Sequence, residues 1–239
     1  MDVTTSTLQL DTPDGKMETY EARPKEGGAY PAIIVLMEAF GLNGHIKNVT
    51  ERIAGEGYVA IAPDLYHREQ ERQVPYSELQ KAIGIMNRLK DDKVMEDVGG
   101  VIKHLKAQNY VKAGSIGVTG FCMGGRFTYL AAAQHSKDVK AAVAFYGGGI
   151  PMGNPSPLSR TGEINAPIYL FFGGKDPLIP AEHVAQINKA LTDHHKTFMM
   201  KLYPNATHGF FCDERQSYHP DAAKDAWEKF KSFFAQHLK

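Results

Sequence analysis

The sequence predicts an α/β fold in which a mostly parallel central sheet is flanked by helices. Short apolar runs of strand length alternate with amphipathic stretches along most of the 239 residues, a pattern typical of βαβ units. The apolar runs are nearly continuous, as in PAIIVLM, which indicates strands buried on both faces of a sheet. Residues 147–165, rich in glycine, proline and serine, are predicted to form a surface loop because a strand pattern resumes directly after them. We therefore expect one domain over residues 1–239.

The expected elements follow one another in a regular order. Residues 5–10 and 17–22 flank the turn-forming sequence TPDG and predict an antiparallel hairpin at the start. The later apolar runs predict strands at residues 31–38, 57–66, 115–121, 140–147, 166–174 and 196–204. Amphipathic spacing predicts helices at residues 45–55, 124–134, 180–193 and 221–237, and two helices within 75–108 separated near residues 90–92. Ligands of open α/β sheets bind at the carboxyl ends of the strands, so functional side chains are expected there.

Charge and composition exclude several classes of function. The 27 Lys and Arg residues balance 27 Asp and Glu residues, so no basic surplus is available to bind nucleic acid. The apolar stretch Ala32–Met37 is too short to cross a bilayer, and the N-terminal sequence MDVTTSTLQL lacks the pattern of a signal peptide. Two cysteines do not form a disulfide framework. We therefore expect a cytoplasmic protein, monomeric or a small homo-oligomer, that binds neither nucleic acid nor a membrane.

Cys122 lies in the most informative segment, GVTGFCMGGRFTYLAAA. A strand pattern runs directly into Cys122, a helix pattern begins within two residues, and Gly120-Phe-Cys122-Met-Gly124 has the form of a nucleophile elbow with cysteine in the place of serine. Such a turn strains the backbone of the nucleophile and leaves no room for side chains two residues away, so glycine suits both places. The helix N-terminus would also favour a thiolate. The alternative is a buried structural cysteine in a glycine-containing turn.

An elbow nucleophile requires a histidine within hydrogen-bonding reach and an acid that orients the histidine. In this type of fold the order along the chain is nucleophile, acid, histidine. Asp176 follows the strand pattern IYLFFGG and His208 follows the strand pattern KTFMMKLYP, so both are expected at carboxyl ends of strands. The alternatives are a turn or N-cap aspartate and an ordinary loop histidine. Together with Cys122, these residues form a candidate Cys-His-Asp triad.

Residues beside the triad candidates could complete the site. Glu38 ends the buried strand pattern PAIIVLME, where a carboxylate is costly unless it has a partner. The backbone N–H groups of Met123 and Ala39 are candidates for an oxyanion hole, since Met123 follows the nucleophile and Ala39 lies in the loop after that strand. A solvent-facing glutamate is the alternative for Glu38, and Asp64 in APDLY is interpreted as a turn residue.

The other histidines do not indicate a metal site. His194 and His195 precede a strand pattern and are expected at the opposite edge of the sheet. His104, His135 and His183 lie in helix patterns without the spacing of metal ligands. No metal and no organic cofactor is implied.

Taken together, these segments resemble the dienelactone hydrolase family, whose archetype is carboxymethylenebutenolidase. The resemblance covers nearly the whole chain and depends on MEAFGLN, APDLYHR, GVTGFCMGGR, FYGGG, FFGGKDPLIP and HGFFCDERQSYHPDAAKDAWEKFKSFF. It implies an α/β-hydrolase fold with a Cys-His-Asp triad at Cys122, His208 and Asp176. It also implies that Glu38 holds the resting thiol and takes its proton when substrate binds, so that the oxidisable thiolate forms only on demand.

The chain departs from the family pattern where the archetype binds the carboxylate of its substrate. The archetype uses two arginines, one of which lies four residues after the histidine, where this chain has Cys212. Arg72 or Arg68 is a candidate for the other arginine. Phe40 and Tyr146 are candidates for the lining of the substrate pocket, with ordinary packing as the alternative for both.

We expect a hydrolase that cleaves a small-molecule ester or lactone through the cysteine nucleophile, without a cofactor. Two alternatives stay open: a thioesterase or peptidase that uses the same triad, and a family member that binds a ligand without catalysis. Arg126, on the helix after the elbow, is expected to have a structural role. The sequence leaves the physiological substrate and the oligomeric state open.

Overall fold

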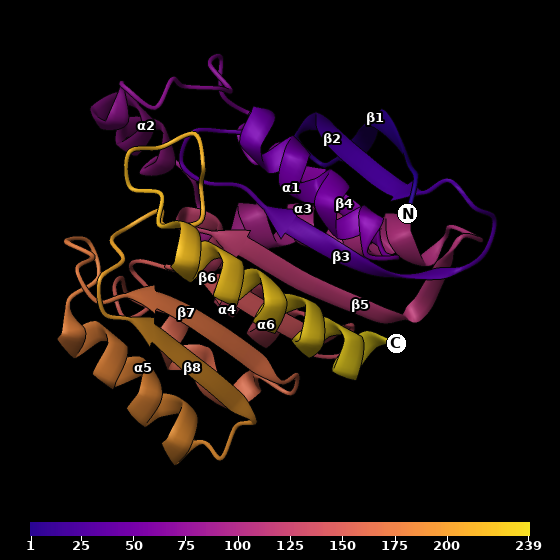
Figure 1. Ribbon diagram of the computed structural model, residues 1–239. Coiled ribbons are helices and arrows are strands. Elements are labelled where there is room, and N and C mark those ends of the chain that lie inside the picture. Colours follow the sequence, from indigo (N-terminus) through magenta and orange to yellow (C-terminus); the bar gives the residue numbers. More distant parts are fainter.

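The structure, a computed structural model that describes residues 1–239, contains one eight-stranded sheet in the order β1-β2-β4-β3-β5-β6-β7-β8 (Figure 1). Its strands are β1 Val3–Thr12, β2 Gly15–Pro24, β3 Tyr30–Leu36, β4 Val59–Pro63, β5 Val111–Phe121, β6 Val139–Phe145, β7 Ile168–Gly173 and β8 Phe198–Tyr203. β2 is antiparallel to β1 and β4, and the other neighbours are parallel. The carboxyl ends of β3 to β8 therefore lie along one edge of the sheet.

Helices cover both faces of the sheet. They are α1 Gly44–Gly55, α2 Leu79–Met86, α3 Asp91–Lys106, α4 Met123–Gln134, α5 Ala181–Asp193 and α6 Pro220–Leu238, with a short 3₁₀ helix, η1, at Pro157–Glu163. In Figure 1, α6 covers the near face of the sheet and α4 lies behind it. α1 shares the face of α6, where the Arg52 guanidinium of α1 lies 4.4 Å from the Trp227 ring centre. α3 shares the face of α4, where Asp91 pairs with Arg126.

The core lies between the sheet and its two helix layers. Every residue of β3 after Tyr30 is buried, as a strand covered on both faces requires. The apolar stripe of α6 buries Ala226, Phe230 and Phe234, which recur every four residues. The 71 buried apolar side chains form one continuous cluster, so the helices of both faces are held to the sheet by the same core. None of the helices combines the length and the apolar character needed to cross a membrane.

The predicted fold class is confirmed, and each predicted strand and helix has a counterpart in the structure. The strand predicted at 57–66 ends earlier, at Pro63, because the Asp64 side chain accepts a hydrogen bond from the Tyr66 N–H at 3.0 Å and turns the chain. The surface loop predicted at 147–165 is present over 151–156, where Met152 to Pro155 are exposed and form no helix or strand, but the prediction is wrong for the rest of the segment. This segment contains the fully buried Ile150 and the helix η1, which packs on α4 through a hydrogen bond of 2.6 Å between the Thr161 and Tyr129 hydroxyls.

Candidate active site

Cys122 lies at the sharp turn between β5 and α4. Its backbone angles, φ 55° and ψ −116°, fall in a region that non-glycine residues rarely adopt. Two glycines make this turn possible, because a Cβ atom at Gly120 would collide with the Gly124 carbonyl and one at Gly124 would collide with the Leu36 carbonyl of β3. The turn presents the Cys122 side chain to a cavity at the carboxyl edge of the sheet.

Asp176 and His208 come from the loops after β7 and β8, two neighbouring parallel strands. A backbone hydrogen bond joins these loops, from the Lys175 N–H to the Ala206 carbonyl at 2.9 Å. Nδ1 of His208 lies 2.8 Å from Oδ2 of Asp176 and must be the donor, since a carboxylate can only accept. The other oxygen of Asp176 accepts the Leu178 N–H at 2.8 Å. Both carboxylate oxygens are thereby fixed, and they fix the orientation of the imidazole.

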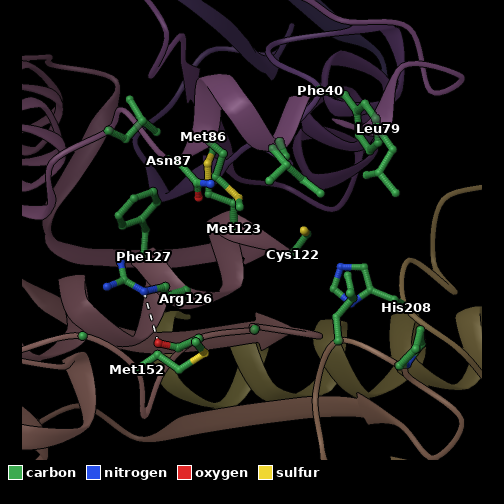
Figure 2. Close-up of a pocket in the computed structure, with 18 of the residues that line it drawn as sticks. Phe40, Leu79, Met86, Asn87, Cys122, Met123, Arg126, Phe127, Met152 and His208 are labelled. Atoms are coloured by element: carbon green, nitrogen blue, oxygen red, sulfur yellow. Dashed lines mark hydrogen bonds between the residues drawn. The ribbon is translucent and has the colours of Figure 1, made fainter. Parts of the chain in front are cut away.

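Cys122 and His208 point into the same space (Figure 2). Nε2 of His208 is buried and has no hydrogen-bond partner, so it is available to a group that enters the cavity. Burial alone would lower the pKa of His208, but the neighbouring Cys122 sulfur and the bonded Asp176 carboxylate outweigh burial and raise the pKa to about 10. The imidazole can therefore hold a proton beside a Cys122 thiolate.

Glu38 directly follows β3 and is fully buried. Its Oε1 atom accepts a hydrogen bond from the Tyr146 hydroxyl at 3.3 Å and lies 3.5 Å from Nη1 of Arg215. Burial and the charge of Glu38 raise the pKa of Tyr146, so the Tyr146 hydroxyl keeps its proton and can donate. Oε2 of Glu38 is buried without a partner. Glu38 thus belongs to a buried ion pair and has one oxygen free to accept a proton or a hydrogen bond.

Arg215 lines the cavity, although sequence reasoning missed it. Two turns bring it back from the loop after His208: the Cys212 N–H donates to the Gly209 carbonyl at 3.1 Å, and the Arg215 N–H donates to the Cys212 carbonyl at 3.2 Å. Gly209 has a φ of 79°, and a Cβ atom there would collide with the Arg215 guanidinium. The guanidinium lies 5.2 Å from the Phe40 ring centre. An arginine shortly after the histidine was the signal in the sequence, but it lies three residues beyond the position of the family pattern.

The two arginines proposed from the sequence have other partners. Arg68 donates two hydrogen bonds to Asp97, at 2.6 and 3.0 Å, and one to Asp14 at 2.9 Å. Arg72 lies 3.7 Å from Asp64. Neither arginine lines the cavity, because each is drawn to a carboxylate outside it, so this expectation is wrong.

Ala39 and Met123 line the cavity beside Cys122. Their backbone N–H groups donate no hydrogen bond to another protein group. Met123 is the first residue of α4, where N–H groups have no partner within the helix. The buried Tyr66 hydroxyl, which sequence reasoning also missed, donates to the Ala39 carbonyl at 2.9 Å and lies 3.7 Å from the Met123 sulfur. Tyr66 therefore connects the loop after β3 to the start of α4.

The cavity has a volume of about 680 Å³, a size typical of sites for small molecules (Figure 2). Apolar side chains form much of its wall, among them Phe40, Leu79, Met86, Met123, Phe127 and Met152. The expectation that Tyr146 lines the pocket is wrong, because its ring is fully buried, 5.2 Å from the His208 ring centre. No group of three or more His, Cys, Asp or Glu side chains has the arrangement of a metal site.

Comparison with known proteins identifies relatives over the whole chain. The sequence pattern of the “Dienelactone hydrolase family” matches residues 17–238. A Synechocystis protein named “Putative carboxymethylenebutenolidase” is 39% identical over 251 aligned residues, which cover 100% of this chain and 99% of the relative. A Salmonella typhimurium protein of the same name is 38% identical, over 92% of this chain and 83% of the relative. The crystal structure of a “Putative Dienelactone Hydrolase” from Klebsiella pneumoniae is 35% identical and superposes with a TM-score of 0.91, over 99% of this chain and 100% of that chain. The chain has the α/β-hydrolase fold and belongs to the dienelactone hydrolase family.

Proposed function

We propose that the chain hydrolyses small-molecule esters or lactones with Cys122 as the nucleophile and with His208 and Asp176 as its partners. The observation that carries this proposal is the position of His208, which is bonded to Asp176 at 2.8 Å and shares the open space with Cys122 (Figure 2). Two further features support it. The strained turn exposes Cys122 to the cavity, and the raised pKa of His208 suits a thiolate–imidazolium pair.

The proposed reaction is an acyl transfer in two steps. The Cys122 thiolate attacks the carbonyl carbon, a C–S bond forms, and negative charge moves to the carbonyl oxygen. The free N–H groups of Ala39 and Met123 are the proposed donors to this oxyanion. When the C–O bond breaks, the leaving oxygen takes the proton of His208. In the second step His208 removes a proton from water, the resulting hydroxide attacks the thioester, and the acid is released as the C–S bond returns its electrons to sulfur.

Two further residues have proposed roles beside Cys122. Glu38 takes up the thiol proton, and Arg215 recognises the substrate. The free Oε2 atom of Glu38 is the proposed acceptor of the thiol proton when substrate binds, in line with the role that the family resemblance implies, and it returns this proton to the Cys122 sulfur when the acid has left. Arg215 lines the cavity and lies 3.5 Å from the other oxygen of Glu38. A substrate carboxylate that binds Arg215 would compete with Glu38 for the guanidinium and free Oε1 of Glu38 from its ion pair. Recognition and activation of the thiol would then be coupled.

Replacement of Cys122 tests the proposed nucleophile. We expect Cys122→Ala to lower kcat/KM for 4-nitrophenyl acetate and for an unsaturated five-membered lactone by on the order of 10³-fold or more, because no other side chain can form the acyl intermediate. Cys122→Ser is expected to retain only weak activity, since an alcohol holds its proton far more tightly than a thiol. Absorbance assays of product release measure both variants.

Cys212→Ala is the matched control, because Cys212 is the other cysteine of the chain and does not line the cavity. We expect it to keep most of the activity. Turnover that survives in a folded Cys122→Ala variant would contradict the proposal. A panel of esters, thioesters and peptides with one common acyl group separates an esterase from a thioesterase or a peptidase. Ligand-dependent protection of Cys122 from iodoacetamide without any turnover would instead indicate a binding protein.

A further inference from the structure

The cavity extends past Cys122 on the side away from His208, into a region that the proposed reaction does not use (Figure 2). The amide of Asn87 lines this region, which we call the acyl arm, beside four apolar side chains, those of Met86, Met123, Phe127 and Met152. Three of the four apolar side chains are methionines, whose flexible thioethers adapt to apolar ligands of different shapes. The lining therefore favours an apolar group.

The far end of the acyl arm carries no free charge. Arg126 lies there (Figure 2), but its two Nη atoms donate to the two oxygens of Asp91 at 2.6 and 2.7 Å. Its Nε atom donates to the Gly149 carbonyl at 3.3 Å. An anionic group would have to displace Asp91 to bind Arg126, whereas a hydrocarbon chain needs no partner. The end of the arm therefore selects against a second acidic group on the substrate.

Exposed apolar side chains gather around this cavity. Leu79, Met152 and Leu178 are 40%, 58% and 52% exposed, and all three line the cavity. Exposed apolar side chains are costly in water, and their concentration around a concave site marks a binding surface. A ligand with an apolar body would remove these side chains from water.

The direction of the proposed reaction assigns the arm to one half of the substrate. His208 gives its proton to the leaving oxygen, so the leaving group lies on the His208 side of Cys122 and the acyl group lies on the other side. We therefore propose that the preferred substrates carry an extended alkyl acyl chain, of hexanoyl to octanoyl length, in the acyl arm. This inference rests on the proposed function and names the class of ester that the site accepts.

The length of the acyl chain tests this assignment. Along the series 4-nitrophenyl acetate, butyrate, hexanoate and octanoate, we expect kcat/KM to rise by about threefold to fourfold per methylene until the arm is filled. Acetates of 4-alkylphenols, which lengthen the leaving group by the same number of carbons, are expected to show no such rise. The assignment would be overturned if kcat/KM did not change along the acyl series, or if it rose equally along the alkylphenol series.

Two methionine variants provide a matched pair. Met152→Lys adds a charge to the exposed wall of the acyl arm, and we expect it to lower the ratio of octanoate to acetate kcat/KM by about tenfold or more. Met199→Lys makes the same change at an exposed methionine of β8, outside the cavity, and is expected to leave the ratio unchanged. Equal ratios in the two variants would contradict the assignment of the arm to the acyl chain.

A binding measurement tests whether the acyl arm binds an alkyl chain independently of whether Cys122 is the nucleophile. Octanamide is expected to protect Cys122 from iodoacetamide at concentrations about tenfold or more below those that acetamide requires, whether or not esters are turned over. If acetate hydrolysis depends on Cys122 but chain length has no effect and octanamide gives no protection, only the assignment of the acyl arm is overturned. Hydrolysis that persists in Cys122→Ala overturns the catalytic proposal, and protection by octanamide would still support the arm.

Discussion

At the scale of single residues, the pair of Glu38 and Arg215 sets the charge beside Cys122. Glu38 is fully buried, and a buried carboxylate destabilises the fold unless a partner compensates its charge. Arg215 supplies that charge at 3.5 Å while its side chain still lines the cavity. This separation is longer than that of a strong charge-assisted hydrogen bond, so a substrate carboxylate with better geometry can compete for the guanidinium.

Replacement of Arg215 tests its proposed role in recognition. We expect Arg215→Gln to raise KM for a carboxylate-bearing ester by about tenfold to a hundredfold, because a hydrogen bond to a charged group contributes about 1.5–3 kcal/mol. A neutral ester of the same size is expected to lose much less. Steady-state kinetics on the two esters measures the difference.

Arg72→Gln is the control for this experiment, because Arg72 lies outside the cavity and pairs with Asp64. It is expected to leave KM for both esters unchanged. If Arg215→Gln raised KM equally for the charged and the neutral ester, Arg215 would not be the residue that recognises the carboxylate.

At the scale of elements, Tyr66 joins three parts of the chain around the proposed oxyanion hole. It follows β4, its hydroxyl bonds the Ala39 carbonyl in the loop after β3, and it lies against Met123 at the start of α4. The Ala39 N–H shares its planar peptide unit with the Glu38 carbonyl, which accepts the Gly41 N–H at 3.2 Å. The Tyr66 hydroxyl holds the next peptide unit, on the other side of the Ala39 Cα, so it limits rotation of the loop that carries the Ala39 N–H. Tyr66 is therefore a positioning residue that acts through Ala39.

Loss of the Tyr66 hydroxyl is expected to affect turnover more than binding. We expect Tyr66→Phe to lower kcat by about threefold to tenfold with little change in KM, and to lower the free energy of unfolding by about 1 kcal/mol. Kinetics and urea unfolding on the same preparation measure both quantities.

Tyr58→Phe is the matched control, since the Tyr58 hydroxyl is buried without a hydrogen-bond partner. It removes the same atom from the core and is expected to keep kcat and to cause no loss of stability. A kcat that stays unchanged in Tyr66→Phe would contradict the positioning role, even if that variant unfolds more easily.

At the scale of the whole molecule, a charged network holds the edge of the sheet to the helix layer. Asp97 of α3 is buried and binds Arg68, from the segment after β4, at 2.6 and 3.0 Å. Arg68 also binds Asp14 in the turn between β1 and β2. Burial alone would raise the pKa of Asp97, but hydrogen bonds from His67 and Arg68 outweigh it and hold the pKa below its usual value.

Removal of the Asp97 carboxylate leaves the Arg68 charge without its buried partner. We expect Asp97→Ala to lower the free energy of unfolding by about 3 kcal/mol at pH 7, as in other broken ion pairs of this kind. Asp14→Asn removes an exposed partner of the same arginine and is expected to have a much smaller effect. Urea unfolding measures both variants.

The free energy of unfolding that Asp97→Ala removes depends on pH, and the lowered pKa of Asp97 gives the direction of this dependence. Because the pKa of Asp97 is lower in the folded than in the unfolded chain, its contribution is complete above about pH 4 and is lost as the pH falls through the lowered value. The stability gap between the unchanged protein and Asp97→Ala is therefore expected to narrow below pH 4. Burial raises the pKa of Asp64 to about 6, but both proteins carry Asp64, so its effect cancels. A gap that widens toward low pH would be inconsistent with the network.

The sequence by itself determined the order of the elements and the turn at Cys122. Strand and helix patterns depend on side-chain periods of two and 3.6 residues, which are properties of neighbouring residues along the chain. The steric demand of the elbow is equally local, so glycines at positions 120 and 124 are enough to indicate it. Asp176 and His208 each follow a strand pattern, and parallel strands end at the same edge of a sheet, so the sequence also assigns both residues to the edge of Cys122.

Only the tertiary structure decided which side chains share the space around Cys122. Arg215 reaches the cavity through two turns, Tyr66 meets Ala39 across 27 residues of sequence, and Met152 belongs to a segment whose composition predicted a surface loop. No side-chain period or sequence motif predicts these contacts, because each depends on how loops from distant parts of the chain pack against one another. The triad candidates could be predicted because strands carry them to a common edge. Arg215, Tyr66 and Met152 could not, because they lie on loops whose paths only the packed core fixes.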